Sequence, residues 1–315
     1  MFVTGQMRVY YDIKDLGKES AELHLALGVF DGVHIGHQAV IKSAVDAAKS
    51  SGGVAGVLTF DPHPIRVLAP DRAPRRILAS LEHKADLLAE QGVELLCVQD
   101  FTLDFAKCEA GDFIKNLTES SQNMKSIAVG EDWVFGKNRS GNIHTLREWG
   151  GELGFDVFAA PPVMVNGERV SSTRIRQAIR DGNLEATREM LGRDYTVVGT
   201  VVEGKKLARQ LGFPTANVVA HNEQLPPDGV WALGVKIDGV SHKAIGNLGR
   251  RPTVEHEGAR RLLEVHVFDF EGDLYGQVLE ADFLKYVRAE KKFDGVEQLK
   301  AQIAADVAFV KTEVF

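Results

Sequence analysis

The chain has 315 residues, of which 44% are hydrophobic and 26% charged, and its formal net charge is −7. This is the composition of an ordinary globular protein, and the length exceeds what one hydrophobic core usually takes, so we expect two domains. No apolar run approaches the roughly 20 residues that span a bilayer, the N-terminus lacks a signal-peptide pattern, and the acidic balance argues against a large nucleic-acid surface. Two cysteines, Cys97 and Cys108, are too few for a disulfide framework, so we expect a cytoplasmic protein.

Predicted strands and helices alternate through the first half of the chain. Because the strands are apolar without clean alternation and helices separate them, we expect a parallel sheet with helices on both faces. In such sheets ligands bind beyond the carboxyl ends of the strands. The expected strands are 23–30, 54–60, 93–99, 126–130 and 156–159, and the expected helices are 37–49, 81–90, 111–118, 145–150 and 173–180.

The stretch LGVFDGVHIGH at 27–37 joins the first strand to the first helix. Asp31 and Gly32 end the strand, and His34 and His37 follow at the expected helix start. Backbone N–H groups and the positive end of the helix dipole favour an anion there, and two imidazoles add donors for a phosphate. The alternative is that both histidines only cap and solvate the helix.

Two further strand ends carry polar side chains that belong at the same edge of the sheet. Asp61 and His63 lie in TFDPHP, whose prolines end the second strand. A rigid turn without a ligand is the alternative for this segment. Asp132 lies in GEDWVFG, an acidic and aromatic loop after the fourth strand. We therefore expect these loops to lie near His34 and His37.

The segment SSTRIR at 171–176 follows the fifth strand and starts a helix. Ser171 or Ser172 suits the N-cap position. Arg174 and Arg176 would lie in the first turn, where the helix dipole disfavours a cation unless an anion is bound. A phosphate ligand would remove this conflict, although arginines are also common on the surface near helix starts.

From Tyr195 onward the pattern changes to short strands separated by Gly, Pro and Asp, which predicts a small antiparallel barrel. The expected strands are 195–202, 230–237, 242–247, 262–270 and 277–283. The chain ends on a helix from Val296, for which Asp294 and Glu297 form a plausible capping box. One face of this helix is apolar, through Val296, Leu299, Ile303, Val307 and Val310.

A near match to a P-loop runs from Gly199 to Lys205. We reject that assignment, because Lys206 stands where a serine or threonine should hold magnesium and because the segment is a predicted strand. Gly204 with the two lysines can still attract a triphosphate through charge and backbone N–H groups.

Two other segments of the second half carry candidate metal and base chemistry. Thr215 and Asn217 in GFPTAN face the same side of an extended backbone and offer two oxygens to a hard cation such as Mg²⁺. A turn in which both bond backbone groups is the alternative. Glu264 lies in LEVHVFDF with His266 and Asp269. If Glu264 faces the threonine and asparagine, it can take the proton from an attacking hydroxyl.

Together these segments resemble the bacterial bifunctional riboflavin kinase/FAD synthetase family over nearly the whole chain. In order they are GVFDGVHIGH, TFDPHP, VGEDWVFG, SSTRIR, LGFPTAN, GNLGRRPTV, LEVHVFDFEGDLYG and VRAEKKFDGVEQLKAQIAADV. The resemblance implies an α/β chain with a Rossmann-like nucleotidyltransferase domain at 1–188. A riboflavin kinase domain would follow at 189–315, as a small antiparallel β-barrel with a C-terminal helix. The kinase would convert riboflavin to FMN with MgATP, and the first domain would adenylylate FMN to FAD and release pyrophosphate.

The resemblance also implies roles for individual residues. The catalytic residues would be Glu264 as the kinase base and His34, His37 and Arg176 in the adenylyltransferase. The magnesium ligands would be Thr215 and Asn217. The adenylyltransferase would bind ATP and flavin through Gly28, Phe30, Asp31, Gly32, His34, Gly36, His37, Asp61, His63, Asp132, Ser172, Thr173 and Arg176. The kinase would bind them through Gly204, Lys205, Lys206, Pro214, Thr215, Asn217 and Arg288.

Two positions depart from the family pattern in the loop before the kinase motif. The family has a histidine ahead of the glycine and a second glycine before an arginine, and here these are Glu203 and Ala208. Glu203 places a negative charge near a triphosphate, and Ala208 restricts the backbone. These departures therefore concern the nucleotide affinity of the kinase site and not its identity.

Three other assignments compete with this one. HIGH also occurs in class I aminoacyl-tRNA synthetases, but the sequence shows no KMSKS-like loop and no basic tRNA surface. An active kinase with a degenerate, regulatory adenylyltransferase module conflicts with the intact histidine, serine, threonine and arginine set. A flavin-sensing protein without turnover conflicts with the retained Glu264. We expect riboflavin, FMN, FAD and ATP as ligands, no nucleic-acid or membrane partner, and a possible homo-oligomer.

Overall fold

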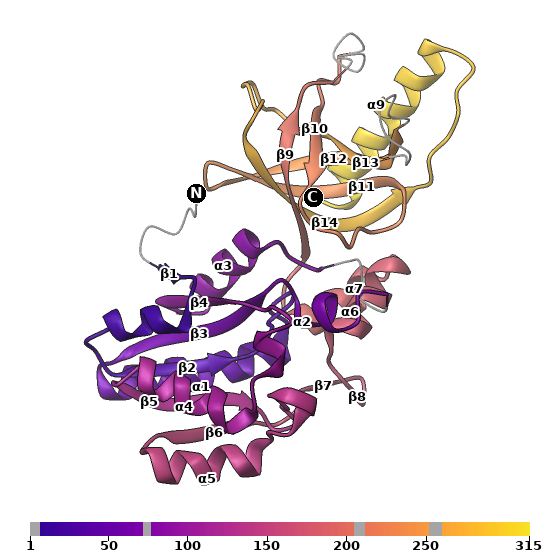
Figure 1. The fold of residues 1–315 in the computed structure, drawn as a ribbon. Helices are drawn as coiled ribbons and strands as arrows, with labels where there is room; N and C mark the ends of the chain where they lie inside the picture. Colours follow the sequence, from indigo (N-terminus) through magenta and orange to yellow (C-terminus); the bar gives the residue numbers. More distant parts are fainter. Residues whose placement is uncertain (1–6, 72–76, 205–211, 252–259) are drawn as a thin grey trace. The chain divides into compact units, whose positions relative to one another are not determined.

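The computed structural model describes residues 7–71, 77–204, 212–251 and 260–315. By its contacts the chain forms two compact units, Met1–Arg75 with Ser80–Ser172, and Arg76–Ala79 with Thr173–Phe315. The first unit contains a parallel sheet and the second a closed barrel (Figure 1), as the sequence predicts. Within the described ranges, no helix combines the length and the apolar character needed to cross a membrane.

Six parallel strands form the sheet of the first unit, in the order β1-β4-β3-β2-β5-β6. From β2 the chain moves through β3 and β4 on one side, and then through β5 and β6 on the other. The order therefore reverses between β2 and β5, and ligands bind at such switch points in open α/β sheets. The strands are β1 (Arg8–Tyr10), β2 (Leu23–Leu27), β3 (Val54–Asp61), β4 (Leu95–Asp100), β5 (Met124–Gly130) and β6 (Asp156–Ala160).

The predicted strands and helices of this unit are confirmed to within a few residues, whereas several elements of six residues or fewer, such as β1, were not predicted. Helix α1 packs on β2, β3, β5 and β6. Cys97 lies in the core, where burial raises the pKa of its thiol to about 12. The helices are α1 (Ile35–Ser51), α2 (Pro64–Leu68), α3 (Leu81–Glu90), α4 (Ala110–Ser120) and α5 (Ile143–Leu153). Short elements are η1 (Ile13–Lys18), η2 (Phe105–Lys107), η3 (Lys137–Arg139), β7 (Met164–Val165) and β8 (Glu168–Arg169).

Six antiparallel strands close the barrel of the second unit, in the order β10-β13-β12-β11-β14-β9. Alternate side chains such as Trp231, Leu263 and Val265 are fully buried and fill its interior. The strand predicted at 262–270 ends at Val267, because Asp269 has a φ of 53°. The strands are β9 (Tyr195–Val202), β10 (Ala216–Ala220), β11 (Gly229–Ile237), β12 (Val240–Arg251), β13 (Arg260–Val267) and β14 (Val278–Arg288). The helices are α6 (Ser172–Arg180), α7 (Leu184–Leu191) and α9 (Val296–Glu313).

The C-terminal helix α9 packs on the outer face of the barrel. Val310 is fully buried in a cluster with outward-facing residues of β11 and β12, and Val307 packs against the same cluster. The predicted capping box is wrong, because the N-cap residue is Gly295 and no side chain caps the helix. Asp294 lies one residue too early to serve, so α9 is held by its apolar face and not by its start.

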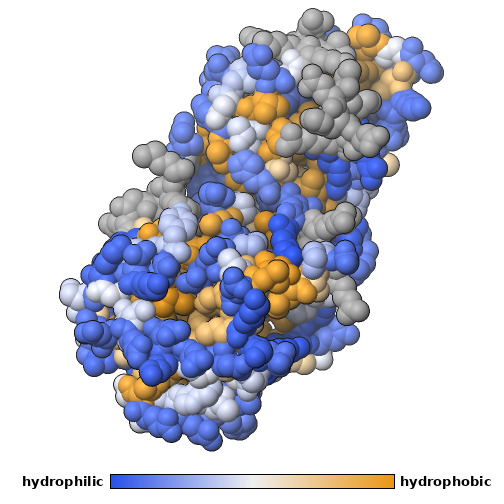
Figure 2. Space-filling view, in the orientation of Figure 1, coloured by the Kyte–Doolittle hydropathy of each residue, from blue (hydrophilic) through white to orange (hydrophobic). Residues whose placement is uncertain are grey.

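Hydrophilic side chains cover most of the face that Figure 2 shows, with small apolar patches between them. The exposed large hydrophobic residues are spread along the described chain and include Leu68, Leu103 and Met164. Scattered residues of this kind are normal on a protein surface and indicate no binding face. The candidate sites therefore have to be found from strand ends and cavities.

Candidate active sites

The turn between β2 and α1 has an unusual backbone conformation. Phe30 and Val33 have φ angles of 51° and 41°, a region that is costly for residues other than glycine. Both side chains are buried, and the ring of Phe30 lies over Gly28, where an added Cβ atom would come within 3.0 Å of it. Gly32, with a φ of 78°, completes the turn. Strained residues persist where packing imposes them, and they gather at functional sites.

His34 and His37 meet at the start of α1. His34 is the N-cap residue, and its Nδ1 accepts a hydrogen bond of 3.2 Å from the backbone N–H of His37. The two rings stack with their centroids 3.5 Å apart, and the edge of Phe30 packs on His37. Gly36 makes room for this, because a Cβ atom there would lie 3.2 Å from the His34 ring. His34 thus caps the helix, as the alternative proposed, and still forms a paired imidazole site.

The environment of His37 disfavours a positive charge on its imidazole ring. Burial lowers its pKa well below the ordinary 6.5, and the charges of His34 and Lys84 lower the pKa further. Its Nδ1 is buried and has no hydrogen-bond partner within the described ranges. A phosphate bound nearby would favour the protonated ring and raise this pKa again. The site is therefore suited to an anion.

Two of the other predicted loops share this edge of the sheet, because β2, β3 and β5 are parallel neighbours. Asp61 ends β3, and His63 caps α2 by accepting a 3.3 Å hydrogen bond from the N–H of Ile65. Asp132 follows β5 and forms an ion pair with Arg169 of β8. The Asp132 carboxylate therefore attaches the β7–β8 hairpin, a role that the sequence did not suggest.

The start of α6 is tied to the β2–α1 turn. The hydroxyl of Ser172 donates a 3.1 Å hydrogen bond to the backbone carbonyl of Asp31, which is itself buried. Thr173 and Arg176 lie further along α6 and fall in the second compact unit. Their contact with the phosphates therefore stays a prediction.

One residue beside the turn that carries His34 and His37 was not predicted from the sequence. Lys84 of α3 is only 7% exposed, and its Nζ donates a 3.0 Å hydrogen bond to the carbonyl of Val29. The sequence could have indicated that Lys84 is buried, because Leu81, Lys84 and Leu88 lie on one helix face at spacings of three and four. A lysine on the buried face of a helix needs a partner or a function.

Three polar residues form a row across the barrel. Asn217 of β10 pairs with Glu264 of β13, and Glu264 pairs with Asn247 of β12. Directly paired residues of antiparallel strands project to the same face of a sheet. Glu264 therefore lies between two amide side chains, of which Asn247 was not predicted as a site residue.

A cavity of about 860 Å³ follows this row. Its polar wall includes Thr215, Asn217 and Glu264, and its apolar wall includes Leu299 and Ile303 of α9. A second cavity of about 570 Å³ also contains the threonine and the asparagine, and continues past Pro214 to Val201, Phe270, Leu274 and Tyr275. The two cavities therefore meet at the predicted magnesium ligands.

Gly204 at the end of β9 lets Asn217 pack against the backbone. A Cβ atom at Gly204 would come within 2.1 Å of the Asn217 amide nitrogen. The strand observed at Tyr195–Val202 agrees with our rejection of a P-loop there. Lys205, Lys206 and Ala208 lie outside the described residues.

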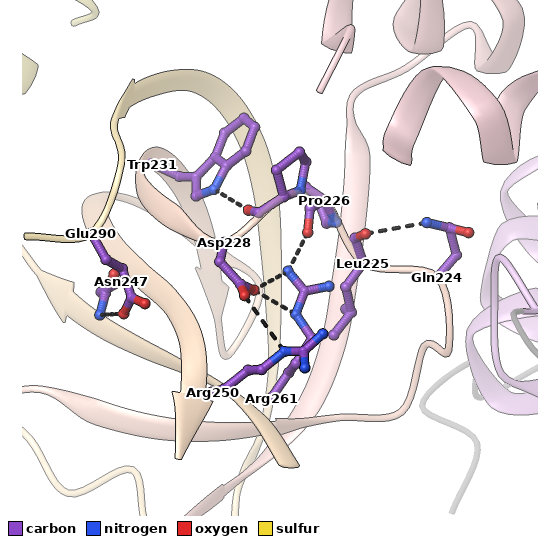
Figure 3. Close-up of polar contacts among 10 residues, drawn as sticks. Gln224, Leu225, Pro226, Asp228, Trp231, Asn247, Arg250, Arg261 and Glu290 are labelled. Carbon is purple, nitrogen blue, oxygen red and sulfur yellow. Dashed lines mark hydrogen bonds and ion pairs between the residues drawn. The ribbon is translucent and has the colours of Figure 1, made fainter. Parts of the chain in front are cut away.

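Figure 3 shows polar contacts beside the larger cavity. Arg261 donates a 2.7 Å hydrogen bond to Asp228, and Arg250 on the neighbouring strand lies 3.8 Å from the same carboxylate. Nearby, the amide nitrogen of Asn247 donates a 3.0 Å hydrogen bond to Glu290. The two arginines thus anchor the loop before β11. The hydrogen bond from Asn247 holds Glu290 beside the row that contains Glu264.

Arg288, a predicted ligand-binding residue, lines the larger cavity and is also hydrogen-bonded to Asp306 of α9. Its Nε donates to both carboxylate oxygens of Asp306 at 3.0 and 2.9 Å, and its Nη2 donates to one of them at 2.7 Å. Gln302 donates a further 2.8 Å hydrogen bond to Asp306. The pair joins the end of β14 to the middle of α9, and so holds the apolar wall of the cavity.

We expect Asp306→Leu to lower the free energy of unfolding of this unit by about 3 kcal/mol, because it leaves a buried guanidinium without its partner. The two side chains are 16% and 7% exposed. Urea unfolding followed by fluorescence measures the change. Asp269→Asn is the control, since its ion pair with Lys311 is solvent-exposed and should contribute less than about 1 kcal/mol. Equal effects of the two substitutions would contradict this role of Arg288.

The polar edge at the switch point of a parallel sheet and the carboxylate-bearing cavity on a barrel give each unit a candidate site, an arrangement suited to a two-unit transferase. A family model of FAD synthetase matches residues 17–174, and one of riboflavin kinase matches residues 191–314. The chain belongs to the bifunctional riboflavin kinase/FMN adenylyltransferase family.

Curated relatives of that name support this membership. The Escherichia coli (strain K12) protein is 40% identical over 286 residues, which cover 90% of each chain. The Pseudomonas fluorescens protein is 36% identical and covers 96% of each chain, and the Bacillus subtilis protein is 34% identical and covers 92% of each. A Streptococcus pneumoniae crystal structure described as a macrolide-efflux protein is 32% identical, with a TM-score of 0.84 over 97% of this chain and 99% of that one.

Proposed function

We propose that this chain catalyses two consecutive ATP-dependent reactions of flavin cofactor synthesis. The barrel unit phosphorylates riboflavin to FMN, and the sheet unit transfers AMP from ATP to FMN to form FAD and pyrophosphate. The observation that carries this proposal is the presence of both sites in one chain, the Asn217–Glu264 row on the barrel and the stacked histidines at the switch point. No observation favours a degenerate adenylyltransferase module.

In the kinase reaction, Glu264 takes the proton of the ribityl 5′-hydroxyl as that oxygen attacks the γ-phosphorus of ATP, and ADP leaves. The larger cavity, with its apolar wall on α9, suits the flavin rings, and the smaller cavity suits the nucleotide. Because Thr215 and Asn217 line both, the γ-phosphate and the hydroxyl would meet beside them. Phosphoryl transfer needs mainly this positioning and charge neutralisation.

A magnesium ion fits the residues present. Mg²⁺ takes oxygen ligands, keeps several waters and uses substrate phosphates, so a hydroxyl and an amide oxygen are enough protein ligands. Thr215 and Asn217 supply these at the meeting point of the cavities. When bound, the ion would neutralise phosphate charge.

In the adenylyl transfer, a phosphate oxygen of FMN attacks the α-phosphorus of ATP and pyrophosphate leaves, without a covalent enzyme intermediate. His34 and His37 donate hydrogen bonds to the phosphate oxygens as negative charge develops on them. Ser172, Thr173 and Arg176 would bind the phosphates from the start of α6, where backbone N–H groups add donors. Asp61, His63 and Asp132 shape the loops of the same edge.

Further parts of the proposal concern organisation. We place the functional boundary at 1–188 and 189–315, which keeps all of α6 with the adenylyltransferase. Riboflavin, FMN, FAD and ATP are the ligands, nucleic acid is not a partner, and a homo-oligomer is possible. A cytoplasmic location suits enzymes that draw on the ATP pool, and it agrees with the two free cysteines.

Purified protein supplied with riboflavin, ATP and Mg²⁺ should form FMN first and FAD second, as followed by chromatography. Supplied with FMN, ATP and Mg²⁺ but no riboflavin, it should form FAD and pyrophosphate in equal amounts. FMN that accumulates without FAD, even when FMN is the substrate, would contradict the adenylyltransferase half and favour the degenerate module.

A further inference from the structure

Lys84 carries a buried charge that the reaction described above does not use. It lies on α3, is 7% exposed, and donates a 3.0 Å hydrogen bond from Nζ to the carbonyl oxygen of Val29. Holding an ammonium group away from water is costly unless nearby groups compensate. Burial accordingly lowers the pKa of Lys84, and the charges of Asp31 and Asp61 act in the opposite direction.

The carbonyl that Lys84 binds belongs to the strained turn before α1. Val29 directly precedes Phe30, the first of the two residues with a positive φ. The same oxygen accepts a second hydrogen bond of 3.0 Å from the hydroxyl of Thr59, a fully buried residue of β3. Two donors from separate elements, α3 and β3, therefore fix one carbonyl of the turn that carries His34 and His37.

The charge of Lys84 also balances the carboxylates of this edge. Asp31 is 4% exposed, and both Asp31 and Asp61 act electrostatically on Lys84. Removing the ammonium group would make the edge where phosphates have to bind more negative, because its positive charge acts against those of Asp31 and Asp61. Among the residues that the structure describes, His34 on its own helix and Lys84 on α3 act electrostatically on His37, and both lower its pKa.

We propose that Lys84 is a positioning residue for FMN adenylylation. It fixes the Val29 carbonyl, and with it the turn that presents the paired histidines, and its charge offsets Asp31 and Asp61 where the ATP phosphates enter. The inference rests on the proposed function of this site.

Three substitutions separate the two parts of this role. Lys84→Gln keeps a donor and removes the charge, Lys84→Arg keeps the charge, and Thr59→Val removes only the second donor to Val29. Lys84→Gln should lower kcat/KM of FAD formation by about 100-fold, which is the size of effect expected for misplaced catalytic groups. Lys84→Arg should retain at least about a tenth of the activity, and Thr59→Val should lose at most about tenfold. Riboflavin phosphorylation by the same variants should not change, and circular dichroism of each variant checks that the sheet unit is folded.

The pKa of His37, measured by NMR from its imidazole carbon signal, gives a readout that a purely structural role would not move. Removing a nearby positive charge raises a histidine pKa. The pKa should therefore rise in Lys84→Gln and stay unchanged in Thr59→Val. Lys42→Gln is the matched control, because Lys42 is exposed on α1 and pairs with Asp46. It should leave both the activity and the pKa unchanged.

The outcomes distinguish this inference from the proposed function. If the wild-type protein forms no FAD, the proposed function is wrong. If the wild type forms FAD and folded Lys84→Gln retains more than about a third of its activity, or its His37 pKa does not move, the role of Lys84 is wrong. If Lys84→Gln does not fold, Lys84→Arg decides, because a folded arginine variant with less than about one hundredth of the activity contradicts the role assigned to the charge.

Discussion

Glu264→Gln should abolish FMN formation while the conversion of FMN to FAD continues. Removing a general base from a positioned pair costs about 10²- to 10⁴-fold in rate, and we expect about 10³-fold here. Glutamine keeps the size of the side chain and its contact with the row of Asn217 and Asn247, so the cavity should keep its shape. Chromatography with riboflavin and then with FMN as substrate measures the two reactions separately.

Glu297→Gln is the control for the loss of a carboxylate, because Glu297 is exposed in the first turn of α9 and lies outside the lining of the larger cavity. It should leave both reactions unchanged. A folded Glu264→Gln protein that still forms FMN at more than about a tenth of the wild-type rate would remove Glu264 from the role of base. Loss of both reactions together would contradict the assignment of one reaction to each unit.

Much of the fold could be predicted because the first half repeats one physical pattern, an apolar strand followed by a helix. Parallel strands bring their carboxyl ends to one edge, so the grouping of the His34, Asp61 and Asp132 loops followed from topology. The short strands separated by Gly, Pro and Asp from β9 onward likewise indicated a barrel. These features depend on periodicity, which a single sequence displays.

The unpredicted features depend on long-range packing. Strand β10 was hidden because Thr215 and Asn217 follow Gly212 and Pro214 and also suit a turn, and only pairing with β9 and β13 makes the segment a strand. The sequence suggested a ligand contact for Arg288 and did not show its ion pair with Asp306, because Asp306 lies on α9, 18 residues away.

Contacts between distant elements also hid two features of the histidine site. Lys84 resembled an ordinary helix lysine until α3 met the carbonyl of Val29. The pairing of Asp132 with Arg169 depended in the same way on a hairpin too short to predict. Polar side chains can serve a ligand or the protein itself, and the sequence pattern does not distinguish these uses.

His37→Ala should abolish FAD formation and spare riboflavin phosphorylation. We expect a fall of about 10³-fold in kcat, because removing one preorganised donor to a developing negative charge costs about 10²- to 10³-fold and the stacked partner His34 loses its support. The buried Nδ1 of His37 has no hydrogen-bond partner among the residues that the structure describes. Removing this nitrogen therefore breaks no hydrogen bond in the turn. Steady-state rates with FMN and ATP measure the effect.

His144→Ala is the matched control, because His144 is exposed at the start of α5 in the same unit. It should leave FAD formation unchanged. If His37→Ala also loses the kinase reaction in a folded chain, the two sites are coupled, and neither site by itself shows how. If FAD formation survives in His37→Ala, the electrostatic work belongs to Arg176 and the start of α6, and the paired histidines only cap the helix.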